Sequence, residues 1–161
     1  MNLGVIKYQG KDFGKSYRYM SKASEVTPKD TTAAMYTGVV AQLSQKDAEA
    51  KVAYEHYMGI GGKDVAIIYG LAQIYKNEKQ EEKALGLIDQ GIKIYPTNKD
   101  LKNEKFNMLI AFNRIEQAIE QLKKTIAADE KDAMSLVNLG LLYENKMSGM
   151  KEEIAKIQDK T

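Results

Sequence analysis

The sequence repeats itself with a period of about 34 residues, and this period constrains the fold more than any other feature. The two prolines, Pro28 and Pro96, lie two such periods apart. A slot of mostly small residues recurs in the same register at Gly4, Gly38, Ala72, Phe106 and Gly140. Periods of this length are typical of arrays in which each unit is a helix pair that buries its apolar face against the next.

Two further slots define the second helix of each unit. Small residues stand at Ser16, Ala50, Ala84 and Ala118, and large ones follow four residues later at Met20, Tyr54, Ile88 and Leu122. Helix axes approach to about 8 Å only where the side chains at the crossing are small. The sequence therefore predicts units of helix, turn, helix and turn, in which the repeated residues form the core rather than a site.

Composition excludes several classes of function. The 161 residues contain no cysteine, which rules out disulfides, thiol catalysis and cysteine-ligated zinc. Lysine and arginine number 24 against 22 acidic residues, and the arginines are Arg18 and Arg114 alone, so we predict no nucleic-acid partner. No apolar stretch has the length of a signal peptide or of a membrane span, about 18 residues.

Candidate catalytic residues are sparse. His56 is the single histidine, and the sequence has no second histidine and no cysteine to share a metal, so a structural or solvent-exposed role is the better interpretation. The carboxylate pairs Glu81–Glu82 and Glu152–Glu153 are adjacent in sequence, and neighbours on a helix point about 100° apart. We therefore predict no enzymatic activity, no cofactor and no metal site.

Two segments of the sequence resemble a known family of helical repeats. The segment GLAQIYKNEKQEEKALGLIDQGIKIYP, residues 70–96, resembles a tetratricopeptide repeat through Leu71, Ala72, Tyr75, Ala84, Ile88 and Pro96, and NLGLLYE, residues 138–144, resembles the first helix of another. The resemblance covers nearly the whole chain, in about four and a half repeats. It implies an all-α fold, a right-handed α-solenoid of antiparallel helix pairs.

We expect residues 1–161 to form a single array with units at about 1–30, 31–64, 65–98, 99–132 and 133–161. The unit at 31–64 carries Thr37 and Ala41 where the family favours leucine and tyrosine, and the unit at 99–132 carries Lys105 and Phe106 in the Leu-Gly slots. Met1 falls at the fifth slot of its repeat, so we expect a fragment of a longer protein whose uncapped ends or C-terminal helix self-associate. Its compartment is left open between the cytoplasm and, if a leader was removed, the bacterial envelope.

The period fails after Tyr143. Continuing the register would place Glu152, Lys156 and Asp159 in slots that are buried in earlier units. The apolar residues instead follow alternating spacings of four and three, at Leu136, Gly140, Tyr143, Met147, Met150, Ile154 and Ile157. This stripe predicts one long helix from about 134 to about 158. The alternative is a tight turn between residues 146 and 151, followed by an ordinary second helix.

The resemblance implies that a partner binds on the concave face, which first-helix residues line. Transferring those slots unit by unit predicts a groove of Tyr8, Met35, Val39, Tyr69, Gln73, Asn103, Asn107, Val137 and Leu141. A neutral lining rich in aromatic and amide groups suits an extended peptide or a helix held by apolar anchors. We therefore predict a protein-interaction module with a protein or peptide partner. The alternatives are that several of these side chains only pack against the next repeat, and that the chain is an architectural spacer or assembly segment without a groove ligand.

One subgroup of the family provides a test. Its chaperone-adaptor members grip a C-terminal carboxylate with lysine, arginine and asparagine side chains from three successive units. In the first frame the corresponding slots hold Met1, Val5, Tyr36, Ala66 and Gly70, and neither later frame supplies the cations. A carboxylate needs positive charge to replace its hydration. We predict that titrating an acidic C-terminal peptide of this type into the chain gives no binding heat in calorimetry, and micromolar binding would contradict the prediction.

Overall fold

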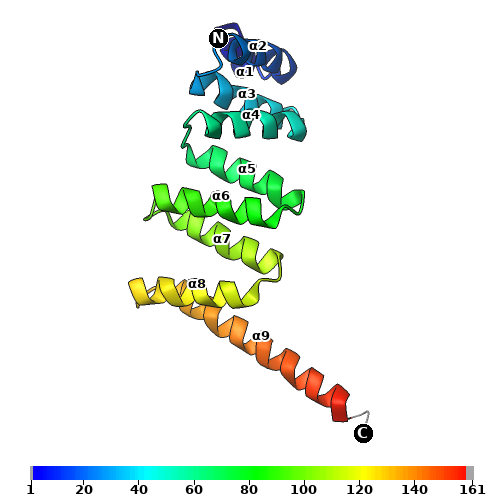
Figure 1. Ribbon diagram of the computed structural model, residues 1–161, viewed down its shortest axis with the longest axis vertical. Coiled ribbons are helices and arrows are strands. Elements are labelled where there is room, and N and C mark those ends of the chain that lie inside the picture. Colours follow the sequence, from blue (N-terminus) through cyan, green and yellow to red (C-terminus); the bar gives the residue numbers. More distant parts are fainter. Residues whose placement is uncertain (1, 159–161) are drawn as a thin grey trace. The chain divides into compact units, whose positions relative to one another are not determined.

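The computed structural model describes the backbone of residues 2–158 and the side chains of residues 3–152, and every regular element within them is an α-helix. The helices are α1 (Asn2–Gln9), α2 (Phe13–Val26), α3 (Thr31–Leu43), α4 (Asp47–Gly59), α5 (Val65–Asn77), α6 (Glu81–Ile94), α7 (Lys99–Ala111), α8 (Ile115–Ala128) and α9 (Ala133–Gln158) (Figure 1). They belong to two compact units, the first ending at Lys102 and the second beginning at Asn103, so the boundary falls within α7. The predicted all-α fold is confirmed.

The helices keep the register of the sequence. Those with odd numbers are the first helices of the repeats, and α3, α5, α7 and α9 begin one period apart at positions 31, 65, 99 and 133. Those with even numbers are the second helices, which begin at positions 13, 47, 81 and 115. Consecutive helices pack on one another from α1 to α6 in the first unit, and α8 packs on α9 in the second. The period of the sequence is thus a period of helix pairs.

A side-chain cap recurs at the start of the first helices. The Oδ1 atoms of Asp30 and Asp64 each accept two backbone N–H groups, the shorter bond being 2.8 Å in both cases. Asn98 and Asp132 each accept one, at 2.9 Å and 3.2 Å. These bonds satisfy N–H groups that have no partner within the helix. The four caps are spaced one period apart, a signal in the sequence that we had not used.

A left-handed residue recurs at the other end of the same helices. Backbone φ is between 56° and 59° at Lys11, Gln45, Lys79 and Asn113, which again lie one period apart. The residue that follows each one donates its N–H back to the helix, as Lys46 does to the Ala41 carbonyl at 2.9 Å. This pattern closes a helix with the chain reversed, and it sets the tight turn from the first helix of a pair into the second.

The repeated small residues allow the two helices of a pair to touch. A Cβ atom built on Gly38 of α3 would lie 2.3 Å from the ring of Tyr54 in α4, and one built on Gly4 of α1 would lie 2.9 Å from Met20 in α2. Both large partners are buried. The small slot of the second helices is likewise fully buried, at Ser16, Ala50, Ala84 and Ala118. The interpretation as core packing is confirmed for these residues, whereas Gly140, in the same slot as Gly38, is exposed.

The long final helix is confirmed, and the alternative of a tight turn between residues 146 and 151 is wrong. α9 runs without interruption from Ala133 to Gln158. Position 147, which corresponds to the left-handed turn residue of the other units, is Met147 and is helical. Glu152, which a fifth second-helix would bury at the small slot, is exposed. Keeping such a charge in water favours the continuous helix.

The packing at Gly38 predicts the effect of one added methyl group. Because that methyl would overlap the buried ring of Tyr54, we expect Gly38→Ala to lower the free energy of unfolding by roughly 1–3 kcal/mol. Gly86 in α6 is exposed, with no atom within 4 Å of a built Cβ, so Gly86→Ala should instead raise it by up to about 1 kcal/mol through helix propensity. Urea unfolding of both variants checks this, and equal effects would contradict it.

Two buried tyrosines predict a loss of stability at alkaline pH. Burial raises the pKa of Tyr54 to about 12, and it raises the pKa of Tyr75 to about 12 together with the hydrogen bond and negative charge of Glu55. These pKa values lie above the usual 10, so the stabilisation is complete below pH 10 and is lost as the pH rises towards 12. We expect Tyr54→Phe to lose less unfolding free energy than the parent chain between pH 8 and pH 11 in urea titrations. Equal losses would contradict this, and the exposed Tyr19→Phe serves as the control.

Candidate functional site

The predicted groove residues of the first unit lie on first helices. Tyr8 is on α1, Met35 and Val39 are on α3, and Tyr69 and Gln73 are on α5. The side chain of Tyr69 is 42% exposed, whereas the other four are half-buried. Tyr69 is therefore the most accessible of the five to a partner.

Part of this face is used by the array itself. The ring centroid of Tyr8 lies 6.0 Å from that of Phe13 in α2 and 6.3 Å from that of Tyr36 in α3, the latter edge to face. Such aromatic pairs stabilise beyond the area they bury. At the end of α3, Gln42 accepts the hydroxyl hydrogen of Tyr54 at 2.8 Å. For Tyr8 and Gln42, packing against neighbouring helices is thus a role the structure shows.

Tyr69 lines a cavity of about 670 Å³ at the beginning of α5. The starts of α5 and α7 and the turn between α6 and α7 contribute its lining, which consists of Asp64, Val65, Ala66, Tyr69, Tyr95, Asp100 and Leu101. The hydroxyl of Tyr95 donates to the Lys63 carbonyl at 2.9 Å, which fixes this ring at the turn. The carboxylate of Asp64 is engaged in capping α5, whereas Asp100 is an exposed first-turn residue of α7.

Tyr95 and Asp100 were missed as site residues. Transferring slots from the middle of each first helix selects residues on that helix alone, whereas this cavity also takes a turn residue and the first turn of the next repeat. The sequence signal was present, since Tyr95 directly precedes the turn residue Pro96. The two carboxylates also make this part of the face less neutral than we expected.

The predicted residues of the second unit form two pairs. Asn103 and Asn107 lie on α7, and Val137 and Leu141 lie on α9, the members of each pair four residues apart. Residues at this spacing are neighbours on one side of a helix. All four are exposed, Val137 at 58% and Leu141 at 52%. One pair offers amide donors and acceptors and the other an apolar surface.

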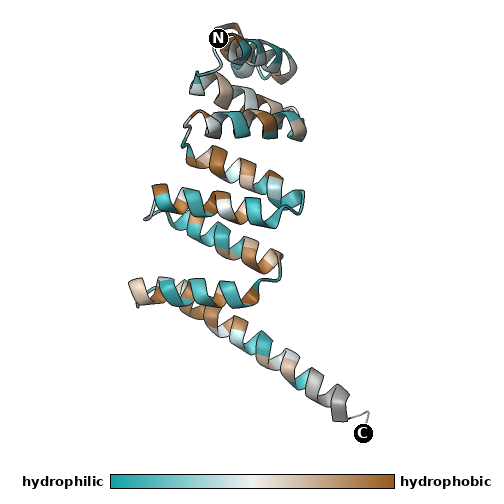
Figure 2. Cartoon of the chain, viewed as in Figure 1, coloured by the Kyte–Doolittle hydropathy of each residue, from teal (hydrophilic) through white to brown (hydrophobic). Residues whose placement is uncertain are grey.

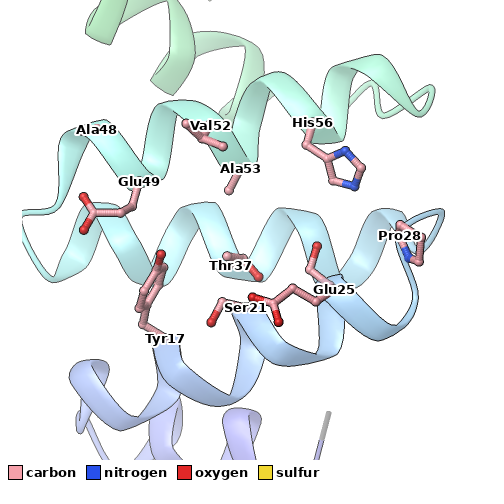
Figure 3. A pocket seen from close by; sticks show the side chains of 11 residues that line it. Tyr17, Ser21, Glu25, Pro28, Thr37, Ala48, Glu49, Val52, Ala53 and His56 are labelled. Atoms are coloured by element: carbon pink, nitrogen blue, oxygen red, sulfur yellow. The ribbon is translucent and has the colours of Figure 1, made fainter.

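A second cavity, of about 520 Å³, lies on the second helices of the first unit (Figure 3). Its lining is Tyr17, Ser21, Ser24, Glu25 and Pro28 from α2 and its following turn, Thr37 from α3, and Ala48, Glu49, Val52, Ala53 and His56 from α4. Burial, and then the negative charges of Glu49 and Glu25, raise the pKa of Tyr17. Lys46 lies over the ring of Tyr17, 4.8 Å from its centroid.

We had not predicted this second cavity, although one residue indicates its cause. Ser24 occupies a slot that holds a large apolar residue in the other units, at Met58, Ile92 and Ile126. A hydroxymethyl group in place of a long apolar chain leaves space between α2 and α4. His56, to which we had assigned a structural role, is half-buried on the wall of this space.

The described residues contain neither a metal-binding cluster nor a membrane-spanning helix. No three His, Cys, Asp or Glu side chains in this part of the chain gather closely enough to hold a metal ion. None of its helices combines the length and the hydrophobicity of a membrane span.

Comparison with known proteins places the fold. No protein-family model and no curated protein sequence matches the chain. Solved structures do: MamA aligns with a TM-score of 0.74 at 18% identity, over 97% of this chain and 90% of its own. YrrB, described as a TPR protein with an unusual peptide-binding site, aligns with a TM-score of 0.70 at 18% identity, over 91% and 76%. PilF of Pseudomonas aeruginosa aligns with a TM-score of 0.62 at 15% identity, over 91% and 67%.

The class of fold is therefore an all-α solenoid of helix pairs. More particularly, the chain has the tetratricopeptide repeat fold, as the register of its repeats and these structural neighbours agree. At identities of 18% or less, the likeness identifies the fold alone.

Proposed function

We propose that the chain is a protein-interaction module whose first-helix face binds an extended peptide or an amphipathic helix of a partner protein. The observation that carries the proposal is Tyr69, an exposed aromatic residue on a first helix at the edge of a cavity of about 670 Å³. Aromatic side chains beside a pocket are the usual anchors of such interfaces. The fold shared with YrrB, a TPR protein with a peptide-binding site, adds support.

The chemistry of the other predicted residues agrees with a peptide ligand. Gln73, Asn103 and Asn107 carry amides able to pair with a peptide backbone, and Val137 and Leu141 offer apolar contacts. The near balance of 24 basic and 22 acidic residues gives no field for nucleic acid. We also propose that the chain has no enzymatic activity. Ser21 and His56 both line one cavity, but the hydroxyl of Ser21 donates to the Arg18 carbonyl at 3.3 Å rather than to a base.

Peptide display provides the test. Peptides selected on the whole chain would be measured by fluorescence anisotropy against the parent chain and Tyr69→Ala. We expect the variant to bind at least about tenfold more weakly, because truncating a buried aromatic anchor typically costs about 2 kcal/mol or more. Asn107→Ala should weaken binding less, through the loss of one amide.

The matched control is Tyr19→Ala. Tyr19 is 38% exposed, close to the 42% of Tyr69, but lies on the second helix α2. It should bind the selected peptides as the parent does, with thermal midpoints of all variants within a few degrees. If Tyr69→Ala and Tyr19→Ala bind alike, the first-helix face is not the ligand site. If no peptide is selected, the architectural alternative is favoured.

A further inference from the structure

The final helix lacks the cover that its counterparts have. In α5, Ile68, Ala72 and Tyr75 are all buried. Ile68 lies beside Gly91 of α6, and Tyr75 lies between α4, where its hydroxyl donates to Glu55 at 2.7 Å, and Lys83 of α6. The same slots in α9 are Leu136, at 47% exposure, and Tyr143, at 39%, with Gly140 between them. A Cβ built on Gly140 meets no atom within 4 Å, unlike one on Gly38. Among the described residues, this face of α9 is covered less than the same face of α5, although Lys123 of α8 lies 5.7 Å from the ring centroid of Tyr143.

The uncovered face extends along α9 as a heptad seam. Leu136, Tyr143 and Met150 are seven residues apart, and Gly140 and Met147 fall between them at a spacing of four and three. Met147 is 58% exposed and Met150 is 54% exposed. Hydrophobic and hydrophilic bands alternate along the described part of α9 (Figure 2). Ile154 and Ile157 continue the spacing in the sequence, although their side chains lie outside the described residues. Three heptads of apolar residues at alternating spacings define the seam of a two-stranded coiled coil.

We propose that the occupant of this seam is α9 of a second copy of the chain, running antiparallel in a two-fold symmetric dimer. A seam made by one helix is self-complementary under a two-fold axis, so the same residues serve both sides. Centring the pair between Ser148 and Gly149 places both of these on the outer side of the coiled coil. Met147 of each copy then lies opposite Met150 of the partner subunit in the two central layers.

The charges beside the seam favour the antiparallel orientation. In that arrangement each flanking position of the heptad faces the same position of the other helix, so Glu144 meets Lys151 of the partner subunit. In a parallel pair Lys146 would instead meet Lys151 of the partner subunit, which is repulsive. Glu144 and Lys151 are both exposed, and Lys146 is 44% exposed while it pairs with Glu116 of α8 at 2.6 Å.

The antiparallel pairing overlaps part of the contact between α9 and α8. The paired segments run from about residue 140 to the end of α9, and within them Lys123 of α8 lies 5.7 Å from the ring centroid of Tyr143 and Lys146 pairs with Glu116 of α8. The partner helix therefore packs beside these contacts, along Met147 and Met150. About 18 residues of overlap correspond to roughly 27 Å of helix at about 1.5 Å per residue. Covering so long an apolar stripe is what a soluble chain requires.

Sedimentation equilibrium of the full chain tests the proposal. We expect a concentration-dependent mass approaching twice that of one chain. Met147→Glu places a charge in the central layer and should raise the dimer dissociation constant at least about tenfold. The matched control Ser148→Glu introduces the same group one residue away, outside the seam, and should leave the dissociation constant unchanged. Circular dichroism would verify that each variant keeps its helix content.

A charge swap determines the orientation. Lys151→Glu should weaken an antiparallel dimer, because Glu144 would then face a glutamate, and the double variant Glu144→Lys with Lys151→Glu should restore it. A parallel dimer would instead be strengthened by Lys151→Glu. Since the chain has no cysteine, mixing Met147→Cys with Met150→Cys chains should also give a disulfide-linked heterodimer in preference to either homodimer.

Each outcome supports or overturns the proposed antiparallel dimer. A monomer at all concentrations overturns the proposal, as does a dimer that Met147→Glu leaves intact, which would point to the uncovered apolar residues Leu3 and Ile6 of α1. Strengthening by Lys151→Glu overturns the antiparallel geometry. A dimer weakened by Met147→Glu and by Lys151→Glu, and rescued by the double variant, supports it. None of these readouts depends on the peptide-binding proposal.

Discussion

The close approach of two helices at one small residue is the contact on which the rest of each repeat depends. A Cβ atom built on Gly38 would lie 2.3 Å from the ring of Tyr54, so only glycine fits beside this ring. The hydroxyl of Tyr54 donates to Gln42 of α3, and a Cβ atom built on Gly70 of α5 would lie 3.3 Å from the same ring. A single tyrosine therefore joins both helices of its own pair to the first helix of the next pair. Placing the large residue on the second helix and the small one on the first allows this interlocking to recur in successive repeats.

The packing determines which surfaces are left for function. Three faces of a first helix are used, by its own second helix and by the repeats on either side, so only one strip of side chains is available to a partner. Tyr69 lies on this strip, whereas Tyr8 is drawn into the aromatic contacts of the array. In α9 one of the three faces is uncovered, and its side chains become accessible although their types are those of a core.

Most of the fold follows from the sequence because each repeat forms the same helix pair, so the same packing positions can be compared between repeats. A slot filled by Gly4, Gly38 and Ala72 indicates a helix crossing more securely than any single residue does. The uninterrupted course of α9 was predictable for the same reason, because the charged residue Glu152 occupies the slot in which Ala50, Ala84 and Ala118 are buried. The division within α7, between Lys102 and Asn103, was not predictable, because it depends on the balance of tertiary contacts rather than on a pattern along the chain.

The candidate site was less predictable than the fold. Slot transfer selected Tyr69, which is exposed, but a cavity is defined by the residues that surround it. Tyr95 and Asp100 enter the lining from the next repeat, and Ser24 opens the second cavity through the absence of bulk rather than through a functional group. Cavities of this kind arise from differences between repeats, which an argument from their likeness does not detect.

The succession of contacts along the chain has a kinetic consequence. The extensive helix contacts join elements that follow one another in sequence, such as α1 with α2, α2 with α3 and α3 with α4. Closing such contacts requires only short loops, so little chain entropy is lost before each gain in packing. Folding is then expected to add one helix pair after another to those already formed, and unfolding to remove them in the reverse order. A helix pair that packs on a neighbour on one side only is therefore expected to open and close many times during the lifetime of pairs that are covered on both sides.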